Sequence, residues 1–495
     1  MLFAIVALLF IVLVVGWWPN RRRRELIDKI PGPYHYPILG AVPYFILQPG
    51  KAWKEFRNYA KSRNYPMYKV VLFGAPYIHF LLPEDIEMVL SSRKHINKTN
   101  VYEYIKLWVG QGIFSSAGEK WHTRRKMASP GLFPKMLQSF VEIFGKHSED
   151  LVERLEEECE KSSTEIQPLV SKCALYGVCE SITGTKLDND NDIDGYFDAT
   201  HRFDTLLMHQ LSRPWYMFFP IFALTPTYRE LKRLARTLHN FTWAIIKKKK
   251  KEVEGFEKLN EYEFEANSER RFGLLDILLL AKNSDHVIDD EGIREEVDTF
   301  LFAGYDTTSA MMTFTLLLLA SYGDIQQNVF NELQDVFGDS DRQPEYQDLQ
   351  NLSYLDKVIR ESLRLYPSVP AISRRITEEI TTRSGYVIPK DTNINIRIFD
   401  IHHDPKLYPD PYKFDPERFS IDNCKNRHPF AYLPFSAGPR SCMGRKFAML
   451  MGKCILSSIL RKYQVEALQP LETVRLMNHA LLTTKEPIRL KFVRR

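Results

Sequence analysis

Residues 435–444 have the sequence FSAGPRSCMG, and this stretch decides what the rest of the chain is expected to build. Cys442 stands between Gly438 and Gly444. Glycine permits backbone dihedrals that other residues avoid and lets the backbone approach a flat ligand closely. The N–H groups of such a loop can donate to a thiolate sulfur, and hydrogen bonds of that kind tune a bound metal. The pattern therefore predicts that Cys442 is a metal ligand held in a tight loop.

The residues around this loop also favour a bound cofactor. Arg440 is a cation two residues before the cysteine and can pair with a carboxylate of such a ligand. Residues 445–461, RKFAMLMGKCILSSILR, are expected to form a helix that starts behind the cofactor, with Cys454 inert on its core face. The chain has six cysteines, without a CxxC pair or a zinc spacing. We interpret all except Cys442 as small buried hydrophobes.

The FxxGxRxCxG spacing resembles the haem-binding loop of the cytochrome P-450 superfamily, and the resemblance covers essentially the whole chain after residue 20. It implies a mainly α fold with small β-sheets, haem b as cofactor, Cys442 as the iron ligand and Arg440 as partner of a haem propionate. A thiolate ligand pushes electron density onto haem iron and favours O–O cleavage. We therefore expect a haem-thiolate monooxygenase that inserts one oxygen atom from O2 into an apolar substrate: a fatty acid, another lipid, a hormone or a xenobiotic.

A long helix is expected over residues 292–322. Its second half, residues 311–320, is almost wholly apolar, which indicates burial on all sides. A second transmembrane span is the competing interpretation, but Asp306 in the middle of the segment makes that costly.

Residues 303–308 of this helix have the sequence AGYDTT. Taken alone, the pattern could mark a helix kink. The resemblance places it over the distal haem face, where Ala303 and Gly304 leave room for dioxygen. Releasing one atom of dioxygen as water consumes two protons, so the chemistry needs an acid and an alcohol together. The resemblance makes Asp306 the residue that relays protons and Thr307 the hydrogen-bond donor to oxygen.

The wider stretch 296–308, EVDTFLFAGYDTT, resembles the signature of the fourth P-450 family. That family includes fatty-acid ω-hydroxylases and insect oxidases of lipids and foreign compounds. It usually has Glu where this chain has Ala303, and His where this chain has Tyr305. The Glu can form an ester with a haem methyl. We therefore expect haem that is not covalently attached, and no tight preference for terminal carbons.

Four further residues are candidates for the haem propionates. Trp121 and Arg125 lie one helical turn apart, so an indole N–H and a guanidinium can face one propionate. Arg374 and Arg375 offer another contact, of which we prefer Arg374.

Glu361 and Arg364 share one face of a helix and can form an ordinary surface pair. The resemblance implies instead a buried network of Glu361, Arg364 and Arg418 with a structural role.

The N-terminus is expected to be a membrane anchor. Residues 1–18 carry no charge, and four arginines follow at 21–24, which favours a cytoplasmic body. A cleaved signal peptide is less favoured because the charges follow the apolar run. We predict an anchor at 1–20, a basic and proline-rich linker at 21–40, and one catalytic domain at 41–495. The expected location is the endoplasmic reticulum membrane, with a single span.

The partners follow from the resemblance and from charge. It implies NADPH-cytochrome P-450 reductase as electron donor and leaves cytochrome b5 open as a second donor. Arg445 and Lys446 could help an acidic partner dock, although solvated charge is an equal alternative. The lysines at 247–251 are expected to be a solvated helix end. The net charge of +5 is small for a chain of this length, and the sequence has no concentrated basic stripe. Binding to nucleic acid is therefore not expected.

Two other functions stay open at this point. One is a haem-thiolate isomerase or dehydratase that rearranges peroxides without a reductase. Asp306 and Thr307 argue against it. The other is a haem-based sensor or carrier without enzymatic activity.

Deleting residues 1–20 is predicted to abolish stable membrane insertion, because that run supplies the apolar length that spans a bilayer. Membranes that hold the full chain or the deletion should be extracted with alkaline carbonate. The full chain should stay in the pellet and the deletion should be released. A deletion that resists extraction would reveal a second span, such as the apolar helix around Leu316.

Overall fold

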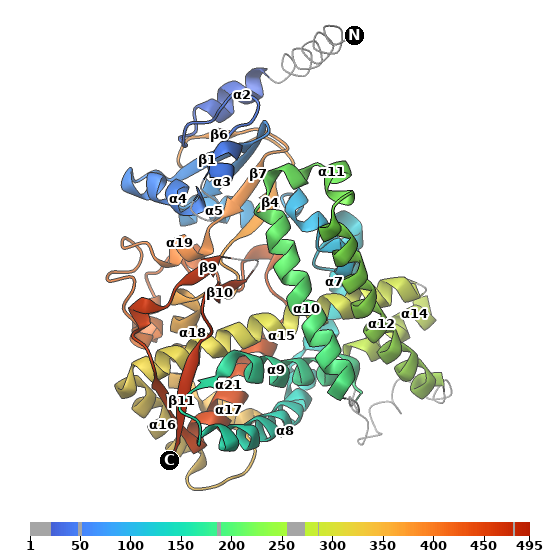
Figure 1. Ribbon diagram of the computed structural model, residues 1–495, viewed down its shortest axis with the longest axis vertical. Helices are drawn as coiled ribbons and strands as arrows, with labels where there is room; N and C mark the ends of the chain where they lie inside the picture. The colour runs from blue at the N-terminus through green and yellow to red at the C-terminus, as the bar shows by residue number, and fades with distance from the viewer. Residues whose placement is uncertain (1–20, 48–51, 186–189, 255–272, 286, 479–480) are drawn as a thin grey trace.

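The computed structural model describes residues 21–47, 52–185, 190–254, 273–285, 287–478 and 481–495. This part is mainly helical with small sheets, which confirms the predicted fold class (Figure 1). The predicted anchor at 1–20 lies outside the described residues. Across the described ranges, no helix combines the length and the apolar character needed to cross a membrane.

The longer helices form the lower and right parts of the molecule in Figure 1. They are α7 (Gly118–Ala128), α8 (Pro134–Glu158), α9 (Ile166–Thr183), α10 (Asp190–Leu211), α12 (Pro226–Glu254), α14 (Leu274–Asp285), α15 (Asp290–Ser321), α16 (Gly323–Phe337), α18 (Ser353–Leu365) and α21 (Arg445–Lys462). Shorter helices are α2 (Arg21–Asp28), α3 (Val42–Leu47), α4 (Ala52–Ser62), α5 (Pro83–Leu90), α6 (Lys106–Val109), α11 (Phe219–Ala223), α17 (Tyr346–Asn351), α19 (Ile398–His402) and α20 (Ile421–Cys424).

Helix α15 is the centre of the structure, as expected from its apolar second half. Asp289 caps its start by accepting from the Gly292 N–H at 2.8 Å. Helices α9, α18 and α21 pack against it, and nearly all side chains from Ser309 to Leu319 are buried. Protein therefore encloses the apolar half of α15, and this accounts for its composition without a membrane.

A four-stranded sheet with the order β1-β2-β7-β4 lies beside the helical part (Figure 1). Its strands are β1 (Met67–Leu72), β2 (Ala75–Phe80), β7 (Asn393–Ile396) and β4 (Ile372–Arg375). Strands β1 and β2 lie within the apolar and aromatic runs of residues 67–82. Strand β7 ends at Ile396, because the chain turns there into α19. Strand β4 pairs with β7, and this pairing fixes the position of Arg374.

Three small sheets complete the β portion. They are β5 (Ile380–Thr381) with β6 (Val387–Ile388), β9 (Leu476–Asn478) with β10 (Leu482–Thr484), and β3 (Thr164–Glu165) with β11 (Arg489–Arg494) and β8 (Tyr463–Ala467).

Residues 21–40, predicted as a linker, pack against the body. Ile27 and Ile30 are buried beside the sheet. The Lys69 ammonium donates to the Ile27 carbonyl and to the Asp28 carboxylate, both at 3.0 Å. Helix α2 ends at Asp28, before the prolines at 31 and 33, and these contacts hold the segment against the body.

The five lysines at 247–251 end α12, as predicted, but they are not all solvated. The Lys249 side chain is 1% exposed and its Nζ lies 3.1 Å from the Asp276 carboxylate, which is equally buried. The prediction was wrong for Lys249, because α14 places Asp276 against this face of α12. Charge periodicity along one helix cannot reveal a partner on another.

The predicted clamp around Glu361 is present and buried. The Arg364 guanidinium donates to the Glu361 carboxylate at 2.7 and 2.8 Å, and both side chains are fully buried. The Arg418 Nε lies 3.5 Å from the same carboxylate. Arg364 also donates to the carbonyls of His402 and Pro411, at 2.8 and 2.7 Å. Every charged group therefore has partners that offset its removal from water.

Arg364→Ala is predicted to lower the free energy of unfolding by about 3–5 kcal/mol, because the Glu361 carboxylate stays buried without its main partner. The matched control is Arg360→Ala, one turn earlier, whose side chain is 38% exposed beside Asp356. Loss of such a pair costs about 0–1 kcal/mol. Urea unfolding of both variants measures the difference, and equal losses would contradict a buried clamp.

Candidate active site

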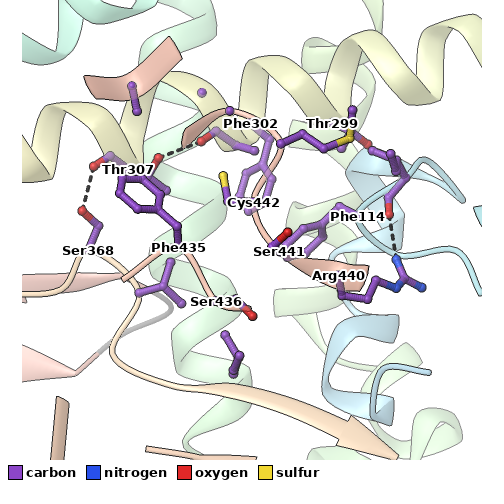
Figure 2. A pocket seen from close by; sticks show the side chains of 18 of the residues that line it. Phe114, Thr299, Phe302, Thr307, Ser368, Phe435, Ser436, Arg440, Ser441 and Cys442 are labelled. Carbon is purple, nitrogen blue, oxygen red and sulfur yellow. Dashed lines mark hydrogen bonds between the residues drawn. The ribbon is translucent and has the colours of Figure 1, made fainter. Parts of the chain in front are cut away.

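A cavity of about 420 Å³ lies between α15 and the loop that holds Cys442 (Figure 2). Ligand pockets of small-molecule enzymes fall in this range of volume. Its walls come from α15, from the segments before α7, from β4 and from the cysteine loop, which are far apart in the sequence. Apolar side chains make up most of the lining, and of the described residues that line the cavity none is Asp or Glu.

Backbone hydrogen bonds within the cysteine loop hold its conformation. The Cys442 N–H donates to the Phe435 carbonyl, and the Ser441 N–H donates to the Gly438 carbonyl, both at 2.9 Å. Gly438 has φ of 70°, and a Cβ there would lie 1.8 Å from the Leu90 carbonyl oxygen of α5. A side chain at 438 is thus excluded by both conformation and space.

The Cys442 sulfur points from this loop into the cavity toward α15 (Figure 2). Burial raises the pKa of the thiol, while the Gly444 N–H and the cations Arg125 and Arg445 act to lower that pKa. A bound metal deprotonates such a thiol, since thiolate is the ligand form. Cys454, by contrast, is buried in α21, and burial raises its pKa to about 12, consistent with an inert thiol.

Helix α15 forms the wall opposite Cys442, with Ala303, Gly304 and Thr307 facing the cavity. The Thr307 hydroxyl donates to the Ala303 carbonyl at 2.8 Å, as expected for a hydroxyl on a helix. Ser368, which the sequence did not single out, donates to the Thr307 carbonyl at 2.8 Å (Figure 2). Two side-chain hydroxyls therefore donate hydrogen bonds to backbone carbonyls within one turn of α15, beside the cavity.

Asp306 does not line the cavity. Its carboxyl lies on the side of α15 that faces α10, where it is hydrogen-bonded to the carboxyl of Asp204. Neighbouring Tyr305 also faces α10 and donates to the Thr200 hydroxyl at 2.6 Å. The predicted acid and alcohol are adjacent in sequence but stand on different sides of the helix.

Cations gather at one side of the cavity. Arg125, Arg374 and Arg440 line it, as predicted, together with Lys98, which the sequence analysis missed. Burial and mutual repulsion lower the pKa of Arg440 to about 9 and the pKa of Lys98 well below its ordinary value. Arg375 instead points outward and pairs with Asp391 at 3.0 Å.

These cations are held mainly by carbonyls and rings. Arg440 donates to the Ile96 and Ile113 carbonyls at 3.1 and 3.0 Å, and Arg125 donates to the Ser441 carbonyl at 3.0 Å. The Trp121 ring, 2% exposed, lies 4.3 Å from the Arg440 guanidinium carbon. Clustered buried cations are costly without an anion. The arrangement therefore fits a ligand that brings its own carboxylates.

Residues 30–492 match the family model described as cytochrome P-450. The chain belongs to the cytochrome P-450 family. It is 34% identical over 492 residues to cytochrome P-450 4c3 of Drosophila melanogaster, covering 96% of this chain and 92% of that relative. It is likewise 34% identical over 465 residues to cytochrome P-450 4V2 of Homo sapiens, covering 93% of this chain and 88% of the relative.

The crystal structure of the cytochrome P-450DA haem domain has the same fold. It matches with a TM-score of 0.79 and 21% identity, covering 94% of this chain and 98% of that one. The resemblance to the P-450 superfamily and its fourth family is confirmed. The protein is a P-450 monooxygenase, and its family implies haem iron with a cysteine thiolate.

The described residues fit haem. A P-450 haem has one face for a thiolate, one face for oxygen and two propionates at one edge. The cavity offers the Cys442 sulfur on one side, small residues of α15 on the other, and the cations around Arg374 at one edge. Lys98 escaped the sequence analysis because a lone lysine between HIN and TNVY has no spacing that signals a ligand.

Proposed function

We propose that this P-450 inserts one atom of O2 into an apolar substrate, with electrons from NADPH through a reductase. The observation that carries the proposal is the opposition of Cys442 and Thr307 across one apolar cavity with a cationic edge (Figure 2). Haem, when bound, supplies the centre at which dioxygen is activated. The reductase supplies the electrons, and this chain's own side chains bind the substrate and deliver the protons.

Cys442 is proposed to ligate the iron, and the Gly444 N–H to hold the sulfur in place. Arg125, Arg374 and Lys98 are proposed to bind the propionates, together with the Trp121 indole and Arg440. The support is their common position at one edge of the cavity and their burial without a carboxylate partner among the lining residues.

Thr307 is proposed to donate to oxygen and Asp306 to supply protons. The Thr307 hydroxyl already lies at the cavity wall and needs only to exchange the Ala303 carbonyl for another partner. Asp306 is the nearest acid in sequence, and it keeps a proton source close to the wall without placing a charge inside the cavity. An acid and an alcohol in this relation suit stepwise proton delivery.

The substrate class follows from the remaining lining. Apolar side chains contributed by α10, α15 and loops form the wall beyond the cysteine loop: Val101, Ile105, Leu207, Leu211, Phe302, Val369 and Leu481. Such a wall binds fatty acids, other lipids, hormones or xenobiotics through apolar burial. Ala303 adds a methyl where many fourth-family members place a carboxyl. We propose that oxidation is not restricted to terminal carbons.

A membrane and a reductase are the proposed partners. Exposed apolar side chains occur in the N-terminal part and around α11, at the end of the molecule where α2 leads toward the N-terminus (Figure 1). They include Ile38, Leu39, Ile46, Leu47, Phe218, Phe219, Ile221 and Leu224. Such a surface supports attachment at the endoplasmic reticulum membrane. Arg445 and Lys446 are exposed beside the cysteine loop and offer charge to an acidic reductase, with cytochrome b5 as a second donor.

Thr307→Ala is predicted to keep NADPH consumption but to lower product formed per NADPH about tenfold, because proton delivery to oxygen loses its donor. Reconstitution with reductase, a panel of lipids and xenobiotics, and mass spectrometry of products measures both quantities. The control is Thr315→Ala, which removes the same kind of helix hydroxyl, bonded at 2.7 Å to the Met311 carbonyl, away from the cavity. Wild-type protein that turns over peroxides but consumes no NADPH would favour an isomerase and overturn the proposal.

The haem is predicted to be held without a covalent bond. Ala303 has no nucleophile, Asp298 is bonded to Thr242 at 2.5 Å, and Asp306 faces Asp204. Acid–acetone treatment of turned-over enzyme should release all haem, and the denatured chain should have its bare mass. A haem-sized increment that survives denaturation would refute this. Ala303→Glu is the positive control, because turnover could then form the ester.

A further inference from the structure

Helix α10 crosses α15 (Figure 1). The two helices meet through polar side chains. Thr200 and Asp204 lie one turn apart on α10, and Tyr305 and Asp306 are adjacent on α15. Thr200 accepts from the Tyr305 hydroxyl at 2.6 Å. Asp204 and Asp306 share a hydrogen bond between their carboxyls. An ionised carboxylate can only accept, so this bond requires a proton on one of the two groups.

The surroundings of the two carboxyls favour a shared proton over a neutralising cation. In the part of the chain that the structure describes, no lysine or arginine forms an ion pair with either carboxyl. Among the described residues, the Oδ1 of Asp204 is buried and accepts no hydrogen bond from a donor group, and the nearby Tyr196 hydroxyl is also buried without a partner. His201 of α10 is the titratable group that acts on Asp306 from the other side.

The two carboxyls differ in pKa and therefore in their affinity for the shared proton. Burial and the neighbouring Asp306 raise the pKa of Asp204 well above its ordinary value. Burial also raises the pKa of Asp306, while His201 and the hydrogen bond from Asp204 act to lower that pKa. Two carboxyls in contact cannot both ionise cheaply. Asp204 is therefore the donor of the shared hydrogen bond and Asp306 is the acceptor.

We propose that Asp204 and Asp306 share a single proton, and that Asp204 is a positioning residue that reloads Asp306 with protons during turnover. This deepens the proposed monooxygenase function and rests on it. In each proton transfer the Asp204 proton moves to Asp306, Asp306 passes that proton toward the cavity, and solvent then reprotonates Asp204. The pair ends each transfer as it began.

Infrared spectroscopy tests the shared proton without turnover. The haem-loaded, resting full-length enzyme should show the carbonyl stretch of a protonated carboxylic acid at neutral pH. Burial also raises the pKa of Glu296 and of Asp298 to about 7, so these acids contribute to the same region, and the pair is read from difference spectra. Asp204→Asn and Asp306→Asn should each remove one component of the band, because each removes one half of the pair. The control is Asp198→Asn, an exposed acid on the same helix, which should leave the band unchanged. A band that is unchanged in both single variants overturns the proposal.

The pH profile of coupled turnover tests the role of Asp204. The hydrogen bond between the two carboxyls holds one proton on the pair, and because the pKa of Asp204 is raised, that proton is lost only as pH rises through the raised pKa. Asp204→Asn still offers an N–H to Asp306 but carries no acidic proton. The alkaline limb should shift to lower pH, with a roughly tenfold loss of product per NADPH at neutral pH that acid restores. Asp204→Glu should recover the wild-type profile.

The outcomes separate this inference from the function itself. An Asp204→Asn variant with the wild-type alkaline limb overturns the role of Asp204, even where wild-type enzyme forms product. Wild-type enzyme that forms no product with reductase overturns the proposed function, and the infrared band alone then decides whether the pair shares a proton. An Asp204→Glu variant that stays as impaired as Asp204→Asn indicates a packing role and also overturns the proposal.

Discussion

The buried ion pair of Arg364 and Glu361 joins the parts of the chain on which the site depends. Arg364 donates to the His402 carbonyl at 2.8 Å, and the His402 Nε2 accepts the Leu433 N–H at 2.9 Å. Leu433 leads directly into the cysteine loop. Burial lowers the pKa of His402 far below its ordinary value, so the ring is neutral and has a nitrogen free to accept. The position of Cys442 is thus fixed from α18 as well as by its own loop.

The opposite wall depends on the two faces of α15. One face carries small residues and a hydroxyl toward the cavity, and the other carries Tyr305 and Asp306 toward α10. This division keeps acids away from the apolar substrate cavity while leaving them within one helix diameter of it. It also explains why the departure of Tyr305 from the usual histidine matters, since its hydroxyl binds α10 at Thr200.

The features that the sequence predicted well are local. The cysteine loop and the Glu361–Arg364 pair are each encoded within a few residues, and the long helix is encoded within one continuous segment. Spacing indicates all three, but the burial of the pair was implied only by the resemblance. Lys98, Ser368 and Asp204 were missed because each contributes a single side chain from a distant segment. Lys249 was assigned to solvent because its partner, Asp276, lies on another helix. The position of Asp306 away from the cavity depends on the rotation of α15, which only packing sets.

The whole site depends on ligation of the haem iron by the Cys442 thiolate, and the spectrum of the reduced carbon monoxide complex reports that bond. We expect the absorbance maximum characteristic of thiolate-ligated haem in the wild-type enzyme and in Cys454→Ala, which removes a buried thiol of α21 outside the cavity. Cys442→Ala should lose that maximum. Its retention in Cys442→Ala, or its absence from the haem-loaded wild-type enzyme, would contradict the account.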